Sequence, residues 1–112
     1  MSKIAYKIKK YKDLKADVTD IDITIQELEE NQTEENLKEK ERLLKLKSAT
    51  EREIARIDNA MSVLNEEEQY ILKTILIDKR KYILIEMKLN LTYSRIKQIE
   101  KKAIKKIEKY LA

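Results

Sequence analysis

Five side chains that can contact DNA bases stand close together near the C-terminus of the chain. They are Tyr93, Ser94, Arg95, Lys97 and Gln98. Arginine and lysine can donate to guanine O6 and N7, and glutamine can form two hydrogen bonds with adenine. Side chains that suit phosphates lie on both sides of this group, namely Arg80, Lys81, Thr92, Lys101, Lys102 and Lys105. Phosphate contacts position a protein and base contacts read sequence, so this spacing predicts an interface with double-stranded DNA. The alternative is a lysine-rich helix face that is only solvated.

The segment "LNLT" at residues 89–92 predicts a turn that positions these side chains. Asn90 tolerates the left-handed conformation of a helix end, and Thr92 is a good N-cap. We therefore expect a short helix over residues 82–89, a tight turn and a longer helix from Tyr93. Apolar residues spaced to hold the two helices together are Ile85, Leu89, Leu91, Ile96 and Ile99. This is a helix-turn-helix, whose second helix enters the major groove by its N-terminal residues in the DNA-binding form.

Charge is uneven along the chain. Residues 65–112 contain 12 basic and 7 acidic residues, whereas residues 1–64 contain 13 and 14. The surplus is concentrated in residues 93–112, with 7 basic and 2 acidic residues. A local basic surface favours nucleic-acid binding. The first dozen residues also carry five lysines and no acid, which predicts a solvated, partly frayed helix start or, alternatively, a second strip of phosphate contacts.

The composition predicts an all-α protein. The chain contains no Gly and no Pro, the two residues that most disfavour helices. It contains no Cys and no His, which excludes disulfides and thiolate sites and removes the commonest general base. We expect neither an enzyme nor a cofactor nor a metal site. No apolar run approaches the length of a membrane helix and no signal peptide is apparent, so we expect a cytoplasmic protein without membrane contact.

Two long helices are predicted in residues 1–64, joined by the loop "ENQTEEN" at residues 30–36. Apolar residues recur in each at steps of three and four, which is typical of helices packed lengthwise. The first series is Tyr11, Leu14, Val18, Ile21, Ile25 and Leu28. The second series is Leu43, Leu46, Thr50, Ile54, Ile57, Met61 and Leu64. An antiparallel hairpin of this kind buries little, so we expect a homo-oligomer, with a dimer favoured, through these helices.

The chain is therefore expected to divide into a hairpin or coiled-coil scaffold over residues 1–64 and a helix-turn-helix domain over residues 65–112. Asn65 is a good N-cap, and Glu68 completes a capping box. We expect this helix to run to about residue 77, followed by a polar break at residues 78–81. Its inward residues are Ile71, Leu72, Ile75 and Leu76. The core side of the last helix is Ile96, Ile99, Ala103 and Ile107, with Tyr110 as a further candidate.

Residues 64–110 resemble region 4 of bacterial sigma factors. The positions that fall on the family pattern are Tyr82, Ile85, Leu89, Leu91, Thr92, Ile96, Ile99, Ala103 and Ile107. With the predicted N-terminal helices, the whole chain resembles phage and prophage late-gene transcription regulators of the ArpU/RinA type. Three positions depart from the pattern: Glu86 replaces a small residue where the two helices cross, Asn90 replaces a glycine, and Asp78 becomes the candidate cap of the helix before the turn.

The resemblance implies a DNA-binding transcription regulator of phage or prophage origin in a bacterial host cell, with RNA polymerase as a further candidate partner. Two alternatives remain open. One is a small terminase-like DNA-packaging protein, which can also join a helix-turn-helix to a coiled coil. The other is a module that binds RNA polymerase without binding DNA by itself.

Overall fold

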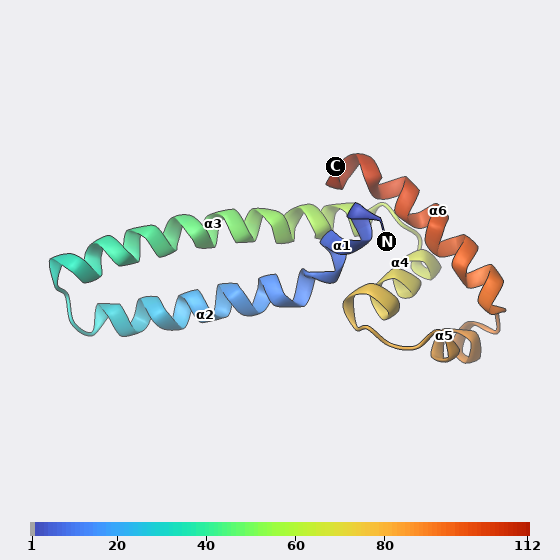
Figure 1. The fold of residues 1–112 in the computed structure, drawn as a ribbon, viewed down its shortest axis with the longest axis horizontal. Helices are drawn as coiled ribbons and strands as arrows, with labels where there is room; N and C mark the ends of the chain where they lie inside the picture. Colours follow the sequence, from blue (N-terminus) through green and yellow to red (C-terminus); the bar gives the residue numbers. More distant parts are fainter. Residues whose placement is uncertain (1) are drawn as a thin grey trace. The chain divides into compact units, whose positions relative to one another are not determined.

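The computed structural model describes residues 2–112, and it confirms the predicted all-α class, because these residues form helices and no strand (Figure 1). The helices follow one another along the chain as α1 (Lys3–Lys9), α2 (Tyr11–Glu29), α3 (Glu34–Ser62), α4 (Glu66–Leu72), the π-helical turn η1 (Lys73–Ile77), α5 (Tyr82–Leu89) and α6 (Tyr93–Leu111). The loop predicted at residues 30–36 is present, and it is shortened to residues 30–33 because α3 begins at Glu34. None of the helices in residues 2–112 combines the length and apolar composition that a membrane-spanning segment requires.

The chain forms two compact units. Unit 1 contains Met1–Tyr11 and Arg56–Ala112, and unit 2 contains Lys12–Ala55. This division falls elsewhere than the expected boundary after residue 64, because α1 packs against α6 and η1. Ile8 of α1 is fully buried. The prediction that the first dozen residues form a solvated, partly frayed helix start is therefore wrong.

In unit 2, α2 and α3 lie side by side and run in opposite directions (Figure 1). Two ion pairs are consistent with this antiparallel arrangement. Lys40 Nζ lies 3.2 Å from Glu29 Oε1 near the loop, and Lys47 Nζ lies 2.7 Å from Asp22 Oδ1 farther from the loop along both helices. The two helices share a small core, made up of Ile21, Ile25 and Leu43, with Leu28 packed against it.

Leu46 does not belong to this core, although its spacing predicted that it would. Its side chain is 47% exposed, while Leu43 and Thr50 are buried. At about 100° per residue, Leu46 lies roughly 60° around α3 from Leu43, on the side away from Lys47. Lys47 faces α2 through its ion pair with Asp22, so Leu46 is turned away from α2. The seam therefore passes from Leu43 directly to Thr50.

In unit 1, one apolar cluster joins three helices. It consists of Ile71 of α4, Ile85 of α5, and Ile96 and Ile99 of α6. Leu89 and Leu91 pack against it as partly buried residues, as their spacing predicted. At the end of α6 the prediction for Tyr110 is wrong, because Tyr110 is exposed and Leu111 is buried in its place.

The helix predicted from residue 65 to about residue 77 is divided. It is α-helical to Leu72 and then widens into η1, where Asp78 N donates to Lys73 O at 2.8 Å. Because a π-turn aligns residues five apart, Leu72 and Ile77 can both face the core, and both are buried. The sequence predicted that Asp78 would cap the next helix. This prediction is wrong, because Asp78 is the C-cap of η1. α5 begins only at Tyr82, with Lys81 in the extended N-cap position.

Candidate nucleic-acid interface

Local signals at the start of α6 set its first residue. Asn90 adopts the left-handed conformation with φ 55° and ψ 46° and ends α5. Thr92 is extended, and its Oγ1 accepts a hydrogen bond from Arg95 N at 3.2 Å. Such a cap satisfies one of the unpaired amides of the first helical turn. Both predictions for this turn are confirmed, and only three residues separate α5 from α6.

The side chains of α6 are sorted onto two faces. Its buried face consists of Ile96, Ile99, Glu100, Ala103, Ile107 and Leu111. At about 100° per residue these residues occupy one side of the helix. The exposed residues around the opposite side are Ser94, Arg95, Gln98, Lys101, Lys102, Lys105, Glu108 and Lys109. The exposed side of α6 is therefore basic along most of its length.

The predicted base-contacting residues lie together on the first turns of α6. Tyr93, Ser94, Arg95, Lys97 and Gln98 are all exposed. Arg95 Nη1 donates to Gln98 Oε1 at 3.3 Å, so these two side chains hold each other on the surface. The Tyr93 ring packs edge-to-face on Tyr82 of α5, with centroids 5.1 Å apart and an interplanar angle of 71°. Half of Tyr93 remains exposed to a ligand.

Lys97 is engaged within the protein, which its sequence position did not reveal. Its Nζ donates to Tyr82 Oη at 3.3 Å and lies 3.8 Å from Glu100 Oε2. The Tyr82 hydroxyl donates in turn to Glu100 Oε2 at 2.7 Å. The hydrogen bond with Tyr82 and the charge of Glu100 raise the pKa of Lys97. Burial and the hydrogen bond to Glu100 raise the pKa of Tyr82.

Tyr82 and Glu100 are thus functional candidates that sequence reasoning missed. The three-residue spacing of Lys97 and Glu100 on one helix is a signal that could have found their pair. No local signal links either residue to Tyr82, because that contact depends on how α5 packs against α6. Together the three side chains tie the first residue of α5 to the second turn of α6.

The predicted phosphate-contacting residues fall into two groups. Arg80 and Lys81 lie in the connection between η1 and α5, and both are exposed. Lys101, Lys102 and Lys105 lie on the exposed side of α6. Thr92 is also exposed, although its hydroxyl already accepts the capping hydrogen bond from Arg95. The Thr92 hydroxyl can still donate a hydrogen bond to a phosphate oxygen.

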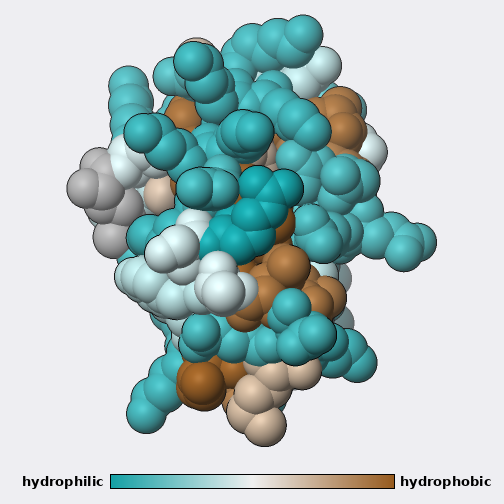
Figure 2. Space-filling view, turned by 90° about the vertical axis from the view of Figure 1, so that its right-hand side faces the viewer, coloured by the Kyte–Doolittle hydropathy of each residue, from teal (hydrophilic) through white to brown (hydrophobic). Residues whose placement is uncertain are grey.

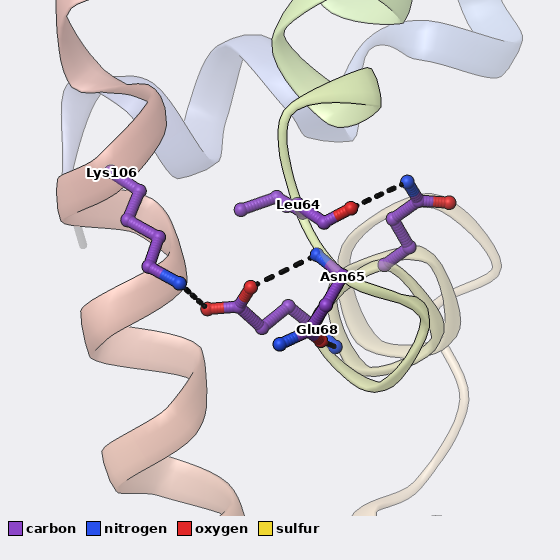
Figure 3. Close-up of polar contacts among 5 residues, drawn as sticks. Leu64, Asn65, Glu68 and Lys106 are labelled. Carbon is purple, nitrogen blue, oxygen red and sulfur yellow. Dashed lines mark hydrogen bonds and ion pairs between the residues drawn. The ribbon is translucent and has the colours of Figure 1, made fainter.

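Lys106 of α6 reaches toward Glu68 at the start of α4 (Figure 3). Its Nζ lies 2.7 Å from Oε2 of Glu68, which is buried at the start of α4. Glu68 also completes the predicted capping box, since its Oε1 accepts from Asn65 N and its own N donates to Asn65 Oδ1. Burial by itself would raise the pKa of Glu68, but the hydrogen bonds from Lys106 and from the Asn65 backbone outweigh burial and lower the pKa. Lys106 therefore braces α6 against α4.

The surface of unit 1 also has apolar parts. Figure 2 shows hydrophilic side chains over most of one face, with hydrophobic surface near its centre and at its lower end, at the height of α5 in Figure 1. The exposed apolar residues of α5 are Ile83, Leu84 and Met87, and Met87 is 76% exposed. These side chains face away from the cluster around Ile85.

A groove of about 610 Å³ lies among α1, η1 and α6 within unit 1. α1 contributes Ala5 and Lys9 to its lining, and α6 contributes Lys97, Gln98 and Lys101. Lys9 therefore lines the same groove as residues predicted to contact DNA. Among residues 2–112, no group of three or more acidic side chains is arranged to hold a metal ion.

Comparisons of the chain with protein-family models, with curated proteins and with solved structures found no match.

Proposed function

We propose that this protein is a sequence-specific DNA-binding transcription regulator in which α5 and α6 form a helix-turn-helix. The observation that carries the proposal is the construction of α6. Its start is set by the left-handed Asn90 and the Thr92 cap, one side is buried against α4 and α5, and the opposite side is basic. This arrangement leaves the first turns of α6 free to enter a major groove, as in helix-turn-helix proteins.

The charge of unit 1 supports the same proposal. Its residues include 17 Lys and Arg against 8 Asp and Glu, a net charge of +9, whereas unit 2 has 8 against 13, a net charge of −5. The whole chain has a net charge of +4, so the two units differ far more than the total indicates. A basic surface attracts DNA by releasing counterions from phosphates.

The residues of α6 take different roles in this proposal. Arg95 and Gln98 are the best candidates for base contacts, with Tyr93 and Ser94 beside them. Lys101, Lys102 and Lys105 bind phosphates, together with Arg80 and Lys81 before α5. Lys97 serves chiefly to orient α6, because its ammonium group already contacts Tyr82 and Glu100.

The resemblance of residues 64–110 to sigma region 4 extends the proposal. It favours a regulator of phage or prophage late genes of the ArpU/RinA type, acting on promoter DNA in the bacterial cytoplasm. The resemblance and the basic side of α6 point to the same residues, Tyr93 to Gln98, as those that read the DNA.

A dimer formed through unit 2 is part of the proposal. Exposed leucines Leu37 and Leu44 stand seven residues apart on α3, which is the spacing of a coiled-coil seam. To contact successive major-groove faces, the two α6 helices of such a dimer would have to lie about 34 Å apart. Sedimentation velocity should give a dimer for the wild type and a monomer for Leu44→Lys. A ring-sized oligomer would instead favour a DNA-packaging protein.

A protein partner is the second candidate function, and the surface of α5 favours it. Ile83, Leu84 and Met87 are exposed together on a short helix. Exposed apolar groups of this kind often mark interaction sites. RNA polymerase is the partner that the sigma-like resemblance suggests, and binding to it is compatible with binding to DNA by α6.

Fluorescence anisotropy with duplex DNA across a salt series tests the main proposal. We expect wild-type affinity to fall steeply as salt rises, because counterions return to the phosphates. The Arg95→Ala/Gln98→Ala variant should bind more weakly and lose discrimination between sequences selected by the wild type and random duplexes. The matched control is Arg52→Ala, which removes an exposed arginine from unit 2 and should leave binding unchanged. If the wild type does not bind DNA even at low salt, the proposal is wrong and the polymerase-binding alternative takes its place.

A further inference from the structure

The short N-terminal helix α1 is a fixed part of unit 1. Its residues Ile4, Ala5 and Ile8 are buried. Ser2 caps the helix, since its Oγ accepts from Ala5 N at 3.0 Å. Lys7 Nζ donates to the backbone oxygen of Leu111 at 2.5 Å, which ties α1 to the end of α6. Side chains on α1 are therefore held in a defined position relative to α6.

The lysines of α1 have different surroundings. Lys7 is bound to the Leu111 carbonyl, and Lys10, which follows the helix, lies over the Tyr6 ring at 4.5 Å. Lys9 lines the groove that also contains Lys97 and Lys101 of α6. Lys9 thus adds a positive charge beside the helix that carries the proposed DNA contacts.

The charges inside the groove make Lys9 important. Glu100 also lines the groove, and its carboxylate lies 3.8 Å from Lys97 Nζ, so these two charges offset each other. The surplus positive charge of the groove then comes from Lys9 and Lys101. Removal of Lys9 would halve this surplus.

We propose that α1 is a second DNA-contacting element and that Lys9 binds a backbone phosphate next to one bound by Lys101. The inference rests on the proposed DNA-binding function of α6. A groove lined by both lysines and apolar side chains suits a sugar-phosphate backbone, whose phosphates are charged and whose sugars present carbon-bound hydrogens. The apolar lining includes Ala5, Ile75 and Ile104.

An acidic protein segment also carries negative charges that lysines attract, but the position of the groove favours DNA. Gln98 and Lys101 belong both to the groove lining and to the exposed side of α6. A duplex held by α6 would therefore reach the groove without a separate binding event. The N-terminal lysines then contribute to affinity and give no sequence information, since phosphate contacts position without reading bases.

The test is the salt dependence of DNA binding by full-length variants. Lys9→Ala should reduce the slope of log K against log salt by about one, because one phosphate contact is lost. Its affinity should be roughly tenfold lower at 50 mM salt, and the difference should shrink as salt rises. Lys9→Arg should restore the slope. Lys10→Ala is the matched control, because it removes the same charge next to α1 from a side chain that does not line the groove.

The outcomes separate this inference from the proposed function. Binding by the wild type together with a reduced slope for Lys9→Ala alone supports the inference. Binding by the wild type with equal slopes for the wild type and Lys9→Ala overturns it, leaves the function of α6 standing and removes Lys9 from the DNA contacts. Equal losses for Lys9→Ala and Lys10→Ala also overturn it, since they indicate a diffuse effect of charge. Absence of any binding by the wild type overturns both. Circular dichroism of each variant checks that α1 and the remaining helices are intact.

Discussion

Units 1 and 2 are built from the same secondary structure, yet they differ in core and in charge. Among residues 2–112, the largest fully buried side chains all belong to unit 1: Ile8, Ile71, Leu72, Ile85, Ile96 and Ile107. The core residues of unit 2 each keep some exposure, and Ile25 is 7% exposed. Unit 1 has a net charge of +9 and unit 2 of −5.

The comparison indicates how a small helical chain can keep a proposed DNA-binding surface and a proposed dimer surface in separate units. In unit 1, several short helices meet at angles, enclose a core and leave one side of α6 exposed. In unit 2, α2 and α3 lie side by side and contact each other along one line only. Unit 2 therefore keeps leucines exposed that a second copy can cover. Under the proposed function, the net negative charge of unit 2 would repel the phosphates that unit 1 attracts. Three pairs of substitutions test this contrast.

The largest effect is expected in the two cores. Ile96→Ala removes a fully buried side chain among Ile71, Ile85 and Ile99 and should lower the free energy of unfolding by about 3 kcal/mol. Ile25→Ala removes a side chain from the shallower core of unit 2 and should lower the free energy of unfolding by about 2 kcal/mol. Urea unfolding followed by circular dichroism measures both values. An equal or larger loss for Ile25→Ala would mean that association gives unit 2 a deeper core.

The second comparison concerns ion pairs. Glu68 is buried and pairs with Lys106 in unit 1, whereas Asp22 and Lys47 form a more exposed pair in unit 2. Glu68→Gln should destabilise the protein by about 2 kcal/mol at pH 7, because a hydrogen bond to a charged group is lost at a buried site. Asp22→Asn should have a smaller effect, since solvent screens an exposed pair.

The contribution of Glu68 to the free energy of unfolding should depend on pH. Its pKa in the folded protein is below the ordinary value of 4.5, so the carboxylate stabilises the fold fully above that pH. As pH falls below 4.5 and through the folded pKa, the carboxylate is protonated and the contribution is lost. The stability difference between the wild type and Glu68→Gln should therefore narrow in this range. A constant difference down to acidic pH would contradict a role for the charge.

The smallest effect is expected for the helix caps. Thr92 Oγ1 accepts from Arg95 N in unit 1, and Thr33 Oγ1 accepts from Asn36 N at 3.1 Å in unit 2. Thr92→Ala should cost about 1 kcal/mol, because the first turn of α6 is held by the buried Ile96 and cannot fray freely. Thr33→Ala should cost less, since Leu37 is exposed and the first buried residue of α3 is Leu43. Thermal unfolding of the two variants measures both losses of stability. A larger loss for Thr33→Ala than for Thr92→Ala would contradict this account of the first turn of α3.

Much of the fold follows from local sequence signals, and less of the candidate site does. The caps at Asn65 and Thr92, the left-handed Asn90 and the apolar spacing from Ile85 to Ile99 were all predicted, and the structure confirms them. The exposed positions of Tyr93, Arg95 and Gln98 follow from the same helical spacing. The environments of Lys97 and Lys106 do not, because their partners lie on other helices.

The sequence by itself determined that this protein is helical, where α4, α5 and α6 begin and where α5 ends. Caps and turns are made by atoms within about four residues of one another, so the residue types at those positions decide them. The tertiary structure decided that α1 joins unit 1, that Leu46 is turned outward, and that Lys9 and Lys101 line the same groove. Those outcomes depend on which apolar helix faces pack against each other in the folded chain. The sequence shows the apolar face of one helix but does not show which other helix packs against it. Contacts between distant residues therefore remained undetermined until the helices were packed.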